Sequence, residues 1–72
     1  MNWAEIEKDW DAMQPLLQSY WTLFTHDDLV GIDRSRIRLI ATVQRVYHLN
    51  ESEAESSVCY FEKNIRKPGA TI

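Results

Sequence analysis

Apolar side chains recur every three or four residues along most of the chain, and this spacing constrains the fold more than any other feature. Such spacing lines one face of an α-helix, whereas a strand needs alternation with a period of two. Alternation of that kind is absent over any useful length. We therefore predict an all-α fold, a small bundle of four short helices (three to five) around a single core. The apolar stripes are Trp3, Ile6, Trp10, Met13, Leu17, Tyr20 and Phe24; Ile32, Arg36, Leu39, Val43, Val46 and Tyr47; and Ala54, Val58, Phe61 and Ile65.

Three sites carry a capping residue followed three positions later by an acid, which is typical of a helix start. The capping side chain accepts a hydrogen bond from a free backbone N–H of the first turn, and the acid favours the positive end of the helix dipole. The pairs are Asn2 and Glu5, Thr25 and Asp28, and Asn50 and Glu53, with Asp33 as a weaker fourth start.

Pro15 interrupts the first apolar stripe. It lacks the N–H that would bond back to Asp11, and it disfavours helical angles at Gln14. We therefore expect a kink or break near Met13 and Gln14, with a second helix that begins at Pro15.

The chain has 72 residues and 44% hydrophobic residues, which is enough for one compact core. Its single cysteine, Cys59, excludes an internal disulfide and any multi-cysteine metal site. We predict one domain over residues 1–72, with a flexible tail from about residue 67. No leader segment is visible, and no apolar run approaches the roughly 20 residues of a membrane span. We therefore expect a cytoplasmic protein without a membrane partner.

The run His26–Asp27–Asp28 has two interpretations, a metal or acid–base cluster and a helix cap. Neighbouring residues at a helix start point in different directions around the axis, so three of them do not easily converge on one ion. We favour the cap, with Thr25 as the capping residue. Cys59 is either a reactive thiol or a small buried hydrophobic residue, and we favour the second. We predict no catalytic residues, no metal site and no cofactor.

Charge is unevenly distributed although the net charge is only −3. Residues 1–33 carry seven acids and one lysine, and residues 34–50 carry four arginines and no acid. Arg34, Arg38 and Arg45 have spacings of four and seven, which place them on one face of the third helix. They could contact an anionic partner, such as nucleic acid, phosphate or an acidic helix, or they could pair with acids of the first helix or remain solvated. Arg36 falls on the apolar stripe, so we expect its stem on the core and its guanidinium at water or an acid.

Several motifs occur together in a fixed order, "MNWAEI…W", "W…FTHDDL", "I…R…L…Q…Y" and "AE…V". In this order they resemble the CsbD-like family of small bacterial stress proteins. The recurring glycines of that family are replaced here by Pro15, Thr22, Arg34, Ala41 and His48. The resemblance implies a four-helix bundle similar to SAM-type domains, a role in the general stress response, and no established catalytic residues. The matching residues are Met1, Asn2, Trp10, Trp21, Phe24 (in place of leucine), Thr25, Asp27, Asp28, Leu29, Ile32, Arg36, Leu39, Gln44, Tyr47, Ala54, Glu55 and Val58.

We therefore expect a non-enzymatic, cytoplasmic, stress-associated protein that acts through surface contacts, with a protein as its partner. The alternative is a nucleic-acid or phosphate-binding module that uses Arg34, Arg38 and Arg45. The net negative charge argues against this alternative. Either a monomer or a homodimer is compatible with the sequence, because a short chain this rich in apolar residues can expose an apolar face.

Overall fold

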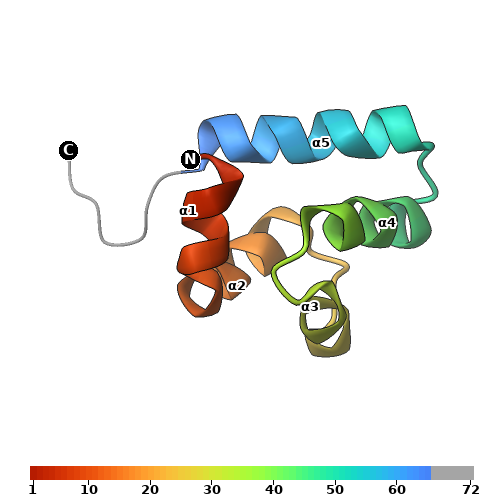
Figure 1. Cartoon of the computed structure of the whole chain (residues 1–72). Coiled ribbons are helices and arrows are strands. Elements are labelled where there is room, and N and C mark those ends of the chain that lie inside the picture. Colours follow the sequence, from red (N-terminus) through yellow and green to blue (C-terminus); the bar gives the residue numbers. More distant parts are fainter. Residues whose placement is uncertain (66–72) are drawn as a thin grey trace.

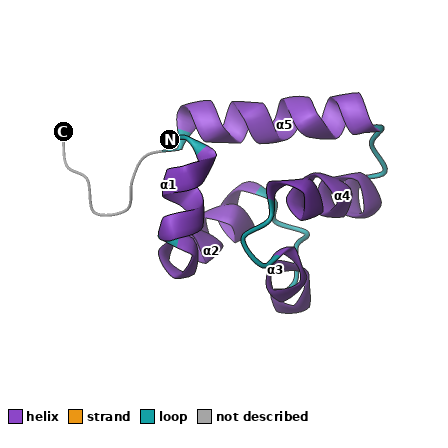
Figure 2. Ribbon diagram, in the orientation of Figure 1, coloured by secondary structure: helices purple, strands orange, loops and turns teal. Residues whose placement is uncertain are grey.

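The computed structural model describes residues 1–65, which form five helices and no strand (Figures 1 and 2). This confirms the all-α prediction, with a helix count at the upper end of the expected range. The tail predicted from about residue 67 lies outside the described residues. None of the five helices has the length and apolar content needed to cross a membrane. The helices are α1 (Trp3–Lys8), α2 (Trp10–Tyr20), α3 (His26–Ile32), α4 (Arg36–Tyr47) and α5 (Glu51–Asn64).

Helices α4 and α5 lie side by side and antiparallel, joined by a short loop (Figure 1). Helix α3 packs on α4, and α1 packs on α2. The N-terminus lies beside the C-terminal end of α5 (Figure 1). The first and last helices are therefore neighbours, although they are far apart in the sequence.

One cluster of buried side chains joins all five helices. Its members come from the predicted stripes, apart from Trp21, which follows α2, and Leu29, which adds to the core from α3. Thr42 is the one buried polar residue in residues 1–65, and its hydroxyl donates to the carbonyl of Arg38 at 2.8 Å. The buried hydrophobic residues are Ile6, Trp10, Met13, Leu17, Trp21, Phe24, Leu29, Ile32, Leu39, Val43, Ala54, Val58 and Phe61.

The three predicted capping pairs are all confirmed as reciprocal capping boxes. In each box the side chain of the first residue accepts from the backbone N–H of the acid, and the acid accepts from the backbone N–H of the first residue. The boxes join Asn2 with Glu5, Thr25 with Asp28, and Asn50 with Glu53.

The prediction of a fourth, weaker helix start at Asp33 is wrong. Asp33 ends α3 in the left-handed conformation at φ 44°, and the cap of α4 is Ser35, which accepts from the N–H of Arg38 at 3.2 Å. The Ser35 cap has no acid three residues later, so it lacks the second half of the pattern that marked the other starts.

The predicted start of a helix at Pro15 is also wrong. Helix α2 continues through Pro15, and the chain changes direction six residues earlier, at Asp9. Pro15 and Asp11 are both exposed, so the carbonyl that loses its helical partner lies on the solvent side, where water can bind it. Burial of Met13 and Leu17, on either side of Pro15, keeps this segment helical.

Replacement of Pro15 by alanine tests this account. Pro15→Ala restores a backbone N–H that can donate to the carbonyl of Asp11 within α2. We expect this change to raise the free energy of unfolding by about 1–3 kcal/mol. Urea unfolding followed by circular dichroism measures the change, with Ser19→Ala on the same helix as the control, expected to gain at most about 0.5 kcal/mol. A loss of stability in Pro15→Ala would contradict an unbroken α2.

Candidate functional site: the outward face of α4

The run at residues 26–28 caps a helix, as expected. The Oδ2 atom of Asp28 accepts from the N–H of Thr25 at 2.9 Å, and its Oδ1 atom accepts from Nη2 of Arg45 at 2.7 Å. His26 and Asp27 are exposed and take no part in this contact network. Within residues 1–65, no three His, Cys, Asp or Glu side chains come together as metal ligands would.

The Asp28 carboxylate is the anchor between α3 and α4. Its side chain is 13% exposed, whereas that of Arg45 is 66% exposed. The backbone N–H of Thr25, followed by the guanidinium of Arg45, lowers the pKa of Asp28 below its usual 3.8. One of the three predicted contact arginines is thus already paired within the chain.

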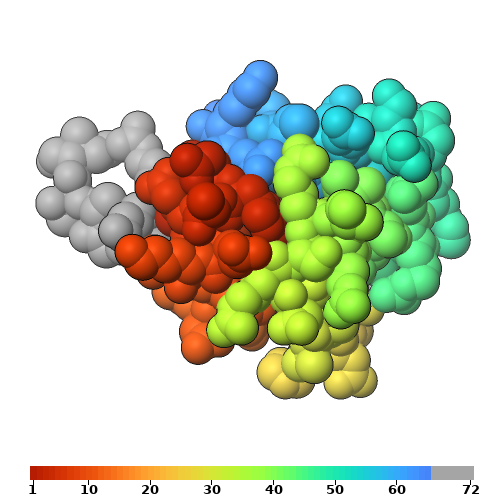
Figure 3. Space-filling view, viewed as in Figure 1, coloured from red at the N-terminus to blue at the C-terminus, as the bar shows by residue number. Residues whose placement is uncertain are grey.

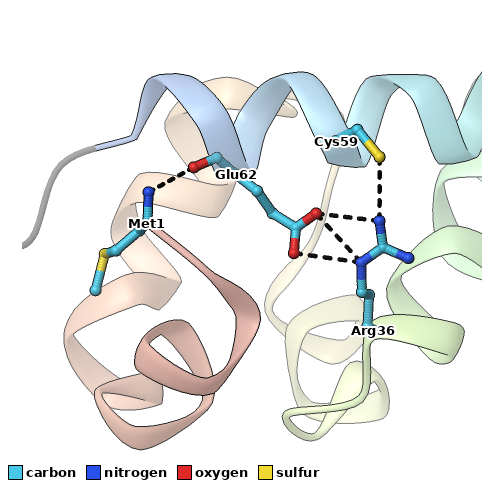
Figure 4. A network of polar contacts seen from close by, with 4 residues as sticks. All are labelled: Met1, Arg36, Cys59 and Glu62. Atoms are coloured by element: carbon cyan, nitrogen blue, oxygen red, sulfur yellow. Dashed lines mark hydrogen bonds and ion pairs between the residues drawn. The ribbon is translucent and has the colours of Figure 1, made fainter.

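Arg36 joins α4 to α5 through a bidentate ion pair (Figure 4). Its Nη2 and Nε atoms donate to Oε1 of Glu62 at 3.0 and 3.2 Å, and Nε also contacts Oε2 at 3.3 Å. Hydrogen bonds to Glu62 raise the pKa of Arg36, against the opposing effect of burial. The expected arrangement, with the guanidinium of Arg36 at an acid, is confirmed.

Cys59 takes part in the same network, contrary to the expectation of a simple buried hydrophobic residue. Its side chain is half-buried, and its Sγ atom accepts from Nη2 of Arg36 at 3.2 Å (Figure 4). Along the sequence, the positive charge nearest to Cys59 is Lys63, four residues further on. Arg36 from the neighbouring helix fills that position, which the spacing along α5 could not reveal.

Two contacts from the start of the chain fix the surroundings of α4. The ammonium group of Met1 donates to the carbonyl of Glu62 at 2.6 Å, where the negative end of the α5 dipole favours a positive charge. The indole Nε1 of Trp3 donates to the carbonyl of Arg34 at 3.1 Å. Residues 1–3 therefore hold both the end of α5 and the turn before α4.

The structure separates the three predicted contact arginines. Arg34 precedes α4 in a left-handed turn at φ 66°, so the expected placement of all three on one helix face is wrong for Arg34. Arg38 and Arg45 lie on α4 and are exposed. Arg34 and Arg38 form no ion pair within residues 1–65, whereas Arg45 pairs with Asp28.

An exposed apolar strip lies on the outward side of α4, between α5 and the arginines. Ile37, at 80% exposure, is the most exposed large hydrophobic residue in residues 1–65. Ala41 follows one turn later and is exposed, while Ile40 and Gln44 are half-buried beside it. We call these four residues, of which three are apolar and Gln44 is polar, the α4 strip. In Figure 3 the start of α4, in green, lies at the surface next to α5, in blue.

The α4 strip is bordered by opposite charges on its two sides. On the α5 side it forms a shallow groove with Glu51 and Glu55. Successive residues of an α-helix are rotated by about 100° around its axis. Arg38 and Arg45 therefore lie at similar angles around α4, on the α3 side of the strip and next to Ala41. We call the strip with these acidic and basic borders the α4 face.

Sequence reasoning missed the α4 strip although a signal was present. Ile37, Ile40 and Ala41 fall outside the stripe that includes Leu39 and Val43, at helical spacings of their own. A second apolar stripe on a helix that already has a core-facing stripe is a sign of a contact surface.

The charge of Asp28 gives the stability of the fold a pH dependence. Because the pKa of Asp28 is lower in the folded than in the unfolded protein, its stabilising effect is present above the unfolded pKa and is lost as the pH falls through the folded value. We expect Asp28→Asn to lower the free energy of unfolding by about 0.5–1 kcal/mol at neutral pH, with a deficit that disappears in acid. Urea unfolding over a pH series measures this effect. Asp27→Asn, an exposed carboxylate of the same turn, is the control, and a deficit independent of pH would contradict the account.

Comparisons of the chain with known protein families, with curated protein sequences and with solved structures find no match. The CsbD-like resemblance and the likeness to SAM-type domains therefore rest on the residues of the chain itself, and both stay predictions.

Proposed function

We propose that this is a non-enzymatic, cytoplasmic, stress-associated protein of the CsbD-like type, and that it acts through contacts made by its α4 face. The observation that carries the surface role is the 80% exposure of Ile37, the first residue of a strip on α4 that is bordered by opposite charges. Contact surfaces in proteins combine an apolar centre with a polar border in this way.

The use of the ionisable groups supports a role without catalysis. Asp28, Arg36 and Glu62 each hold one helix against another or cap a helix, and both carboxylates and two of the three guanidinium nitrogens are hydrogen-bonded in those contacts. A catalytic acid or base must instead face a substrate across a cleft. The buried cluster consists of apolar side chains and Thr42, whose hydroxyl is bonded to its own helix.

The backbone gives support to the family resemblance. Two of the five positions at which the family's glycines are replaced, Arg34 and His48, adopt positive φ angles of 66° and 57°. Glycine is the residue that adopts this conformation without strain. A relative with glycine at these two positions would therefore fit the same backbone more easily than this chain does. The association with stress comes from the resemblance alone.

A complementation experiment tests the proposal in the organism that carries the gene. We expect deletion to lower survival after heat, osmotic or oxidative stress, and the wild-type gene to restore it. The double variant Ile37→Glu/Arg38→Glu should fold but fail to restore survival, because both changes alter the α4 face. Val30→Glu, which changes a 59% exposed apolar residue on α3, is the matched control and should restore it. Normal survival of the deletion strain under every stress would contradict the proposal.

A second candidate function is binding of nucleic acid or phosphate. It is favoured by the exposure of Arg34 and Arg38, which form no ion pair within residues 1–65. It is opposed by the engagement of Arg45 with Asp28 and by the net charge of −3.

A titration with single-stranded and duplex DNA at low and moderate salt tests this candidate. Phosphate contacts weaken steeply with salt, so true binding would appear first at low salt and would be lost in an Arg34→Ala/Arg38→Ala/Arg45→Ala variant. We expect no binding even at low salt. Salt-sensitive binding that the triple variant abolishes would replace our first proposal.

A further inference from the structure

We infer that α1 is a latch for the α4 face. When α1 is docked, it holds the turn from which α4 begins, and when α1 opens, the first turn of α4 is released with it. This inference rests on the proposed function, because it names the regulation of the same surface. The contact that carries it joins the indole Nε1 of Trp3 to the carbonyl of Arg34 at 3.1 Å. In Figure 3 the red surface of α1 adjoins the light green surface of the segment that leads into α4.

The turn between α3 and α4 has a strained backbone. Asp33 and Arg34 are adjacent, and they adopt positive φ angles of 44° and 66°. Residues other than glycine enter this region only at a cost in free energy, which aspartate bears more easily than arginine. Such a conformation persists only where contacts from the rest of the fold hold it. Arg34 is therefore the point of the turn that most needs an outside contact.

Two hydrogen bonds hold this turn, and they differ in range. The N–H of Ser35 donates to the carbonyl of Ile32 at 2.9 Å, which is a bond within the turn itself. The other bond comes from Trp3, 31 residues away in the sequence. Within residues 1–65 the carbonyl of Arg34 accepts no other hydrogen bond. Docking of α1 thus provides the contact that opposes the strain at Arg34.

The first turn of α4 starts from this strained turn. Its cap, Ser35, is the next residue, and the Ser35 hydroxyl accepts from the N–H of Arg38 at 3.2 Å. This first turn contains no acid, and it places the cation of Arg38 at the positive end of the helix dipole. Ile37 and Arg38 of the α4 face both lie on it. Leu39 is fully buried, so the part of α4 that can open ends before Leu39.

Helix α1 can open without the rest of the fold. It has six residues, too few for a helix that is stable on its own, so it depends on contacts with its neighbours. The chain changes direction at Asp9, which marks the boundary between α1 and α2. Ile6 is the one side chain of α1 that is buried. Opening of so small a unit requires less free energy than global unfolding.

Coupling between α1 and the α4 face acts in both directions. If docking of α1 favours the ordered first turn of α4, a partner that binds Ile37 and Arg38 favours docking of α1 by the same factor. Any change that lifts α1 from its site correspondingly weakens that partner. The docked fraction of α1 therefore sets the fraction of molecules in which the α4 face is complete.

Amide hydrogen exchange of the full chain, followed by NMR, tests the latch. Trp3→Phe keeps an aromatic ring and removes the N–H donor. We expect exchange to accelerate by roughly three- to tenfold at two amides, that of Ile6 in α1 and the capped amide of Arg38. The amide of Glu53 is the matched control. It makes the same kind of capping bond, to Asn50 at 2.8 Å at the start of α5, and it should be unchanged.

A glycine substitution tests whether backbone strain is the link. Arg34→Gly removes the cost of the positive φ angle, so we expect exchange at Ile6 to slow by roughly threefold. In this background Trp3→Phe should accelerate exchange at Arg38 by less than about twofold. His48→Gly is the control, because it relieves the positive φ angle of 57° at the other end of α4. It should leave exchange at Ile6 unchanged and preserve the full effect of Trp3→Phe.

Circular dichroism checks that every variant is folded. Faster exchange in α1 without faster exchange at Arg38 would overturn the inference. So would equal acceleration at Glu53, or an Arg34→Gly variant that acts on Ile6 no more than His48→Gly does. These results differ from failure of the proposed function, because exchange is measured without a partner. Coupled exchange in a protein whose deletion has no stress phenotype would refute only the proposed function. Uncoupled exchange, with survival still lost in the α4 variant, would refute only the latch.

Discussion

Packing of α4 against α5 is the constraint that places every other element. Leu39 and Val43 of α4 and Val58 and Phe61 of α5 are at most 1% exposed and belong to one buried cluster. At about 25 cal/mol per Å² of apolar area, each of these side chains contributes roughly 2 kcal/mol of transfer free energy. The other helices attach to this pair through particular contacts. The rings of Tyr20 and Trp21, at the end of α2, lie 5.3 and 5.0 Å from that of Phe61, measured between ring centres.

Polar contacts fix the angles at which the helices meet. Arg45 and Asp28 join α4 to α3, Arg36 and Glu62 join α4 to α5, and the indole of Trp3 joins α1 to the turn before α4. These groups could be taken for a reactive site if read as single residues. In the fold they hold one helix against another, and we propose that contacts with another molecule are made by the exposed residues of α4 instead.

Features encoded within a few residues were predictable, and features that depend on distant contacts were not. The capping boxes at Asn2, Thr25 and Asn50 need only residues i and i+3, so the sequence identifies them directly. The change of direction at Asp9 has no glycine or proline to mark it. It accompanies a contact between Trp3 and the carbonyl of Arg34, 31 residues away. The partner of Cys59 likewise comes from another helix. The exposure of Ile37 was not predicted, although the position of Ile37 outside the core-facing stripe of α4 indicated it.

Amide hydrogen exchange followed by NMR tests the central role of the α4–α5 pair most directly. If this pair is the frame of the fold, the amides around Leu39, Val43, Val58 and Phe61 exchange only through global unfolding, with free energies equal to that measured in urea. Amides of α1, a helix of six residues, open at lower cost. Exchange in α4 as fast as in α1, or slowest exchange in α2, would contradict the account.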